Sequence, residues 1–356
     1  MRLTVEQART GCTWQRALCV KNAAPTYVAL IDELVRRLDE GDAVAELLLE
    51  DGQDPVQSAL CLRLFGAVNR IAMAESADWL DACYATRGGF TDVERVVPAF
   101  FGFLESHVDE VREQMKVNVQ TNEVGRSAPL SAAMNHVSLA TGLPLRLLEV
   151  GASAGLNMLF DGYFVDAGEG SWGPADSPLR LTGHFTSGRP AAAVPSIDSR
   201  AGCDLNPIDV HDPSSADLLR SFVWPEHVDR ARRLEAALEV ARTEPPLAIE
   251  ASDACAWVES RLAELPSGVM TVVFHSVVAT YFDPEVRDRF AKIIRAAGER
   301  AGDDNPLAWI SLEPSKEDSS VVELVCETWP GDRRVLLART TPHGTDVRWE
   351  TWDGQE

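Results

Sequence analysis

The chain has 356 residues, of which 45% are hydrophobic and 25% are charged, as in globular proteins with a substantial core. Its net charge of −22 disfavours nucleic acid and anionic membranes as partners, because both bind clustered Lys and Arg. Residues 1–10 lack the apolar run of a signal peptide, and no stretch is long enough to span a bilayer, so we expect a cytoplasmic protein. Seven dispersed cysteines without a C-x-x-C pair predict buried, reduced thiols and no metal site.

The first 140 residues have the apolar periodicity of helices. Apolar side chains recur every three or four positions in 27–38, which places them on one helix face. A second stripe covers 56–71 behind Pro55, a residue suited to a first helical turn, and a third lies within 91–119. We therefore predict a helical N-terminal domain over residues 1–140.

From residue 141 to 356, short apolar runs alternate with helical segments. The expected strands are 145–150, 246–251, 269–278 and 307–313, and the expected helices are 228–241, 257–265 and a segment from 286. This alternation predicts an α/β domain with a mostly parallel sheet covered on both faces. The runs 321–327 and 333–340, joined by the turn PGD, predict an antiparallel hairpin at one edge. The loop-rich segment 161–196 is expected to be an inserted hairpin or lid.

The stretch GASAG, residues 151–155, directly follows the strand-like run LRLLEV. Its G-x-S-x-G pattern is typical of a hydrolase with Ser153 as nucleophile, but such an enzyme needs strands and an oxyanion-hole segment upstream, where this chain is helical. The dinucleotide fingerprint G-x-G-x-x-G would require glycine at 153 and 156, and the chain has Ser153 and Leu156. The third interpretation, with Glu149 as E-x-G-x-x-x-G, is a nucleotide-binding loop.

Two later strands support the third interpretation. Asp204 lies in GCDLNP after a plausible short strand, and Asp253 follows the run PLAIEA. Because the carboxyl ends of parallel strands meet at one edge of a sheet, the two carboxylates are expected beside the glycine loop. Asp204 can accept hydrogen bonds from both ribose hydroxyls, and Asp253 can accept from an adenine amino group.

The series LLEVGASAG, GCDLNP, EASDA and GVMTVVFHSVVATYF resembles the ordered motifs of class I, Rossmann-like S-adenosylmethionine-dependent methyltransferases, from about residue 143 to the end. The details of TNEVGRSA, LLEVGASAGLN and FVWPE resemble an uncharacterised bacterial branch of that superfamily, a domain of unknown function. The resemblance implies a Rossmann-like methyltransferase sheet, with S-adenosylmethionine as cofactor. It implies no particular substrate.

Positions matched to the superfamily motifs carry over cofactor-binding roles. The resemblance implies that Glu149, Gly151 and Gly155 form the loop against the methionine part of the cofactor, with Ser153 as a small cofactor-binding residue within that loop. It implies that Asp204 holds the ribose and that Asp253 and Ala254 flank the adenine. Phe274 and Ser276 would line the floor of the site. Asn122, Glu123 and Arg126 of TNEVGRSAP are expected to cover the carboxylate end of the cofactor, with an Arg–Glu pair at the domain junction as the structural alternative.

Two further residues are candidates for catalysis. His275, inside an apolar strand, is a candidate general base toward an acceptor, or alternatively a core residue with its hydrogen bonds satisfied. Glu313, at the end of LAWISLE, is either a catalytic or substrate-binding carboxylate or part of a loop ion pair.

The predicted function is methyl transfer from S-adenosylmethionine to an acceptor, and the strand end FHSVV lacks the N-P-P-Y pattern of enzymes that methylate nucleic-acid bases. The acidic charge also favours a small-molecule acceptor. The alternatives are a cofactor-binding or scaffolding protein without turnover and, third, a serine hydrolase that uses Ser153. The sequence does not predict an oligomeric state.

Overall fold

The computed structural model describes residues 2–168, 170–318 and 320–350. Residue 169 of the expected insertion and residues 351–356 of the expected second domain lie outside this range. The chain divides into two units, one made of Met1–Thr121 with Asp212–Arg232, the other of Asn122–His211 with Arg233–Glu356. The sequence had predicted a single boundary at 140. The difference arises because helix α8 (Ser127–Thr141) packs on strands of the second unit, while α9 (Pro213–Ser221) packs on α4 (Leu60–Ala74) of the first.

The first unit is helical. Its other α-helices are α1 (Val5–Lys21), α2 (Pro25–Glu40), α3 (Glu46–Glu50), α5 (Asp78–Cys83), α6 (Val93–Ser106) and α7 (Val108–Gln114). The stripe predicted in 27–38 is the buried face of α2. The stripe predicted from 56 becomes helical only at Leu60, because Ala59 has a left-handed backbone (φ 51°) and the Asp54 side chain caps a separate turn. The stripe in 91–119 is split into α6 and α7 at His107.

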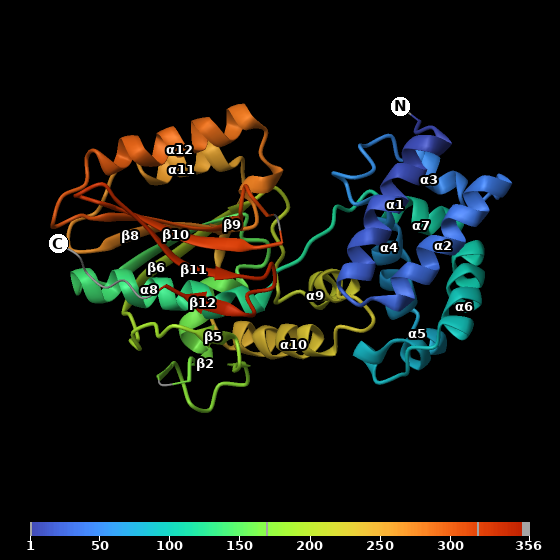
Figure 1. Ribbon diagram of the computed structural model, residues 1–356, viewed down its shortest axis with the longest axis horizontal. Coiled ribbons are helices and arrows are strands. Elements are labelled where there is room, and N and C mark those ends of the chain that lie inside the picture. The colour runs from blue at the N-terminus through green and yellow to red at the C-terminus, as the bar shows by residue number, and fades with distance from the viewer. Residues whose placement is uncertain (1, 169, 319, 351–356) are drawn as a thin grey trace. The chain divides into compact units, whose positions relative to one another are not determined.

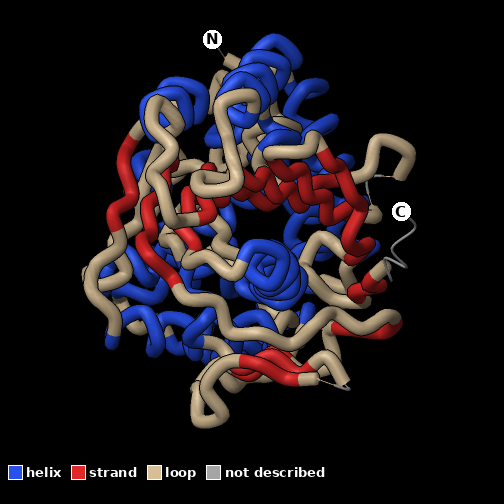
Figure 2. Tube along the Cα trace, turned by 90° about the vertical axis from the view of Figure 1, so that its left-hand side faces the viewer, coloured by secondary structure: helices blue, strands red, loops and turns tan. Residues whose placement is uncertain are grey.

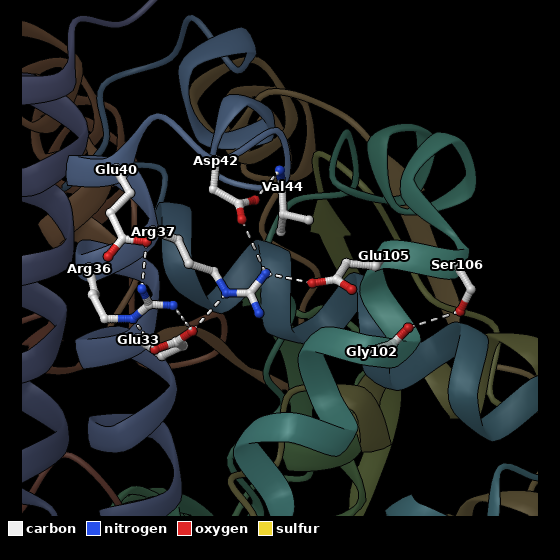
Figure 3. A network of polar contacts seen from close by, with 9 residues as sticks. All are labelled: Glu33, Arg36, Arg37, Glu40, Asp42, Val44, Gly102, Glu105 and Ser106. Carbon is white, nitrogen blue, oxygen red and sulfur yellow. Dashed lines mark hydrogen bonds and ion pairs between the residues drawn. The ribbon is translucent and has the colours of Figure 1, made fainter.

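Arg37 links two helices of this unit. Its guanidinium donates to Glu33 on α2 at 2.8 Å and to Glu105 on α6 at 2.6 Å, and its Nη1 lies 3.5 Å from Oδ2 of Asp42 (Figure 3). The same group stacks on the ring of Phe101, 4.4 Å from the centroid. Because only 15% of the Arg37 side chain is exposed, these contacts fix the spacing of α2 and α6.

The second unit is built on one large sheet. Among the described residues nine strands form it, in the order β5 (Phe185–Ser187), β12 (Val347–Trp349), β11 (Arg333–Thr340), β10 (Val322–Trp329), β9 (Leu307–Pro314), β8 (Met270–Ser276), β1 (Leu145–Val150), β6 (Ile197–Asp204) and β7 (Ala248–Ala251). Strands β7, β6, β1, β8 and β9 are parallel, whereas β9 to β12 form an antiparallel meander. The predicted α/β class with a mostly parallel sheet is confirmed.

Helices cover both faces of this sheet. Figure 1 shows α11 (Ala254–Arg261) and α12 (Pro284–Gly298) along one face and α8 along the other, and Figure 2 shows the strands between helical layers. Alternate residues of β1 explain the arrangement, because Leu148 and Val150 enter the core under α11 and α12 together with Phe290 and Ile294. Helix α10 (Val228–Thr243) contains the boundary between the two units.

The structure places the expected hairpin and the expected insertion differently from the sequence prediction. The hairpin β10–β11 is not at the edge, because β12 pairs with β11 and β5 pairs in parallel with β12. The segment 161–196 contributes β5 to this edge, and its strands β2 (Phe164–Asp166), β3 (Ser171–Trp172) and β4 (Arg180–Leu181) form a separate small sheet. The segment therefore extends the main sheet as well as forming an insertion.

All seven cysteines are buried free thiols, as predicted. Of the helices in the described residues, none combines the length and the apolar character needed to cross a bilayer.

Candidate functional site

The order in which the chain adds parallel strands to the sheet reverses at β1. From β1 the chain adds β6 and β7 on one side, and it then returns to add β8 and β9 on the other. Ligands of open α/β sheets bind outside the carboxyl ends of the strands at such a reversal. The stretch GASAG follows β1 directly, so the predicted glycine loop lies at this point of the fold.

The glycine loop has an unusual backbone. Gly151, Ser153 and Gly155 have φ values of 68°, 53° and 73°, a left-handed conformation that glycine adopts without strain. The amide of Gly151 donates to the carbonyl of Cys203 at the end of β6, at 2.9 Å. A Cβ atom on Gly151 would lie 2.4 Å from Cγ2 of Val278. The loop is therefore tied to β6 and packed against the segment that follows β8.

Asp204, at the end of β6, is part of this arrangement. Its Oδ2 accepts a hydrogen bond from the amide of Ser153 at 2.9 Å, and its Oδ1 accepts from the amide of Asn206 at 2.9 Å. A carboxylate is a hydrogen-bond acceptor, the kind of group that can bind ligand hydroxyls. The structure thus brings together three of the predicted cofactor-binding residues, Gly151, Ser153 and Asp204.

Asp253 has a structural role of its own. It is the N-cap of α11, where its Oδ1 accepts from the amide of Ala256 at 3.0 Å, and it is exposed. Ala254, the first residue of that helix, is half-buried. The sequence prediction that these two residues flank an adenine stays a prediction, and the capping role accounts for the aspartate by itself.

Glu149 lies beneath the glycine loop and is 2% exposed. Its side chain is hydrogen-bonded to Asn157, while its Oε2 has no hydrogen-bond partner among the residues that the structure describes. Burial and then the nearby charge of Asp204 raise the pKa of Glu149 well above its usual value, against the opposing charge of Arg126. Its neighbour on β8 is Phe274, which is completely buried and so helps to exclude water from the carboxyl group.

The segment TNEVGRSA also reaches this edge of the sheet. Oδ1 of Asn122 accepts from the amide of Leu156 at 2.9 Å, directly behind the glycine loop. Nη1 of Arg126, in the 3-10 turn η2 (Val124–Arg126), donates to the carbonyl of Ser276 at 3.0 Å, and its Nε donates to the carbonyl of Pro342 at 2.9 Å. Arg126 thereby joins the end of β8 to the loop after β11.

A Glu–His pair in the same region was not predicted. Oε2 of Glu123 accepts from Nδ1 of His343 at 3.0 Å, with 4% of the Glu123 side chain exposed. The two loops are in very close contact, because a Cβ on Gly125 would lie 2.3 Å from the carbonyl oxygen of His343. A carboxylate bound at Nδ1 fixes the tautomer and orientation of the ring.

His275 is buried and Glu313 is half-buried, and the two share a hydrogen-bond network. The indole of Trp309 donates to Nε2 of His275 at 3.0 Å, so Nδ1 carries the proton and donates to Oε1 of Glu313 at 2.6 Å. The same Oε1 accepts from the amides of Val278 and Ala279 at 2.9 and 3.0 Å. Both ring nitrogens are engaged and the ring is 2% exposed, so the geometry favours the core alternative for His275. Glu313 positions the segment that packs on the glycine loop.

Residues 10–349 match the model of a family described as uncharacterized protein conserved in bacteria (DUF2332). The chain belongs to this bacterial family. The match spans both structural units, so the helical unit is part of what defines the DUF2332 family. No curated protein shows significant similarity to the chain.

Among the described residues of this DUF2332 protein, no group of three or more His, Cys, Asp or Glu side chains is arranged to hold a metal ion.

Glu313→Gln is expected to lower the free energy of unfolding near neutral pH by about 1–3 kcal/mol, because a buried charged acceptor is lost. Burial alone would raise the pKa of Glu313, but the bonds from His275, Val278 and Ala279 hold it below its usual value of 4.5. The ionised group therefore stabilises the fold above that pH, and this stabilisation is lost as the pH falls through the lowered pKa. Chemical denaturation at neutral and acidic pH measures the effect, and a deficit independent of pH would contradict it.

Proposed function

We propose that this protein is an S-adenosylmethionine-dependent methyltransferase that acts on a small-molecule acceptor. The observation that carries the proposal is the glycine loop at the strand reversal, with three left-handed residues and a bond from the amide of Ser153 to the carboxylate of Asp204. A backbone of this kind can approach a nucleoside ligand closely, and the neighbouring carboxylate can accept its ribose hydroxyls.

The residues at this edge fit the proposed cofactor chemically. Glu149 offers an unpartnered buried oxygen for a cationic group, which suits the ammonium of the methionine part. Asp204 is assigned to the ribose hydroxyls, and Asp253 with Ala254 is assigned to the adenine. Arg126 and Asn122 are assigned to the carboxylate end, where a guanidinium can form a bidentate bond. Ser153 and Gly155 shape the loop between these groups.

When bound, the cofactor would supply a methyl group on a sulfonium centre for direct transfer to an acceptor nucleophile, with S-adenosylhomocysteine as the leaving group. The contribution of the chain is then to bind and align the two reactants and to exclude water. The side chain of Val278 packs against the glycine loop, and the amide of Val278 donates a hydrogen bond to Glu313. These two residues therefore position the segment at the floor of the site. With both nitrogens of His275 engaged, the proposal assigns it a positioning role rather than that of a base.

Calorimetric titration with S-adenosylmethionine and S-adenosylhomocysteine tests the proposal. We expect micromolar binding of both, weakened at least about tenfold, or about 1.4 kcal/mol, by Asp204→Ala. Asp209→Ala is the matched control, because exposed Asp209 makes a similar local bond, to the amide of His211 at 2.9 Å. Asp204→Asn keeps one acceptor oxygen and serves if the alanine variant fails to fold. No heat with either ligand in folded protein would overturn the proposal.

A second candidate function rests on Ser153. Its positive φ of 53°, on a turn between a strand and the 3-10 helix η3 (Leu156–Gly162), is the backbone expected of a nucleophile elbow. Labelling of the protein by a fluorophosphonate, abolished by Ser153→Ala, would support a serine hydrolase instead.

Binding of S-adenosylmethionine without transfer to any acceptor in a broad screen would favour a cofactor-binding or scaffolding protein without turnover.

A further inference from the structure

The carboxyl group of Glu149 is buried without a full set of hydrogen bonds. The residue is 2% exposed, and within the described part of the chain its Oε2 has no hydrogen-bond partner. A buried polar atom left without a hydrogen bond destabilises the fold, so its retention needs a reason. Glu149 is the penultimate residue of β1, directly ahead of the glycine loop, which places this atom next to the proposed cofactor site.

Charged groups of both signs face this carboxyl group. Asp204 at the end of β6 is negative and Arg126 of η2 is positive, and both act on Glu149 through their charges. Asn157 of η3 bonds to it, and Oδ1 of Asn157 in turn accepts from the hydroxyl of Ser127 on α8 at 2.7 Å. The bond from the neutral Asn157 therefore orients the carboxyl group, and no positive group among the described residues is hydrogen-bonded to Oε2.

The remaining neighbours are neutral and exclude water. Phe274 on β8 is completely buried beside Glu149. Tyr163 follows η3, is also completely buried, and donates from its hydroxyl to the carbonyl of Leu156 at 2.6 Å. Burial raises the pKa of Tyr163 well above its usual value, and the charge of Glu149 adds to this rise, so Tyr163 stays uncharged. The surroundings favour an uncharged Glu149 unless a cation is placed beside it.

We propose that the site takes a cationic group of its ligand at Oε2 of Glu149, and that the carboxyl group releases its proton to solvent as the ligand enters. The inference rests on the proposed function, with S-adenosylmethionine as ligand. The step is balanced, since the O–H bond of the acid breaks, the proton goes to the buffer, and the ligand cation replaces it beside the carboxylate. The charge within the site is thus unchanged by binding.

The raised pKa of Glu149 sets the direction of the pH dependence. The carboxyl group is protonated in the free protein below its raised pKa, whereas the complex requires the carboxylate. Ligand affinity should therefore increase with pH until the pKa of the free protein is passed, and should then level off. If the carboxyl group of the free protein were already ionised, ligand affinity would show no such increase over the pH range below the raised pKa.

The test is calorimetric titration with S-adenosylmethionine in phosphate and in imidazole buffer at the same near-neutral pH. The difference in observed heat between buffers of different ionisation enthalpy gives the protons released, and we expect about one per ligand bound. Glu149→Gln, which has the same shape, should bind with no buffer dependence. Glu264→Gln, at an exposed position, should behave like the unaltered protein.

Two further ligands identify the cation. S-adenosylhomocysteine keeps the ammonium group and lacks the sulfonium charge, whereas 5′-methylthioadenosine lacks both. Release with the first and not the second supports the inference with the ammonium at Glu149, and release with S-adenosylmethionine alone supports it with the sulfonium. Binding of S-adenosylmethionine without release overturns the inference and leaves the proposed function standing. If none of the three ligands binds, the proposed function fails and the inference with it.

Discussion

Arg63→Met is expected to lower the free energy of unfolding of the helical unit by about 3–5 kcal/mol, as when one partner of a buried ion pair is removed. The Arg63 side chain is fully buried on α4, where its guanidinium pairs with Asp51, which is 6% exposed. It also donates to the carbonyls of Ser58 and Met115, each at 2.9 Å. Methionine fills the volume but leaves a buried carboxylate and two carbonyls without their donor. Chemical denaturation, with hydrogen exchange of the α4 amides, measures the loss.

Arg16→Met is the matched control for this prediction. Arg16 makes two bonds to Asp32, at 2.6 and 2.9 Å, but the side chains are 44% and 52% exposed. Water can solvate both groups after the substitution, so we expect a much smaller loss than for Arg63→Met. Similar losses in the two variants would show that burial is not what makes the Arg63 pair important.

Strands β1, β8 and β9 of the central sheet were predictable because each is a continuous apolar run, whereas β6 (IDSRAGCD) is not. The run LRLLEV is β1 without a change of boundary, and 269–278 contains β8. The edge of the sheet formed by β5 and β12 was not predictable. These two strands have three residues each and pair across a long separation in sequence. A segment of three residues carries no measurable periodicity, so only tertiary contacts define it.

The candidate site was predictable where the strand ends themselves carry the residues. Gly151 and Asp204 follow β1 and end β6, and parallel strands bring such positions together. Asp253 could not be assigned from its type, because aspartate before a helix is as well suited to capping as to binding a ligand. The partner of His343 could not be found either, since Glu123 lies in a distant segment and only the close contact of Gly125 joins the loops.

Gly151→Ala is expected to impair both the stability of the sheet unit and its ligand binding. An L-residue at φ 68° costs about 1–2 kcal/mol in backbone strain. The new methyl group would also lie 2.4 Å from Cγ2 and 2.9 Å from Cγ1 of Val278, whose amide is held by Glu313. Because Val278 is anchored, the glycine loop must shift, and we expect S-adenosylmethionine to bind at least about tenfold more weakly in calorimetric titration.

Two comparisons separate backbone strain from the clash with Val278. Gly268→Ala places the same residue at φ 77° with no atom within 4 Å of its Cβ, so it should show the loss of stability without the loss of binding. Adding Val278→Ala to Gly151→Ala removes the two Cγ atoms that the new methyl group meets. The double variant should then recover part of the affinity, a non-additivity expected of residues in contact. If Gly151→Ala behaved like Gly268→Ala in both measurements, packing of the segment after β8 on the glycine loop would not control the site.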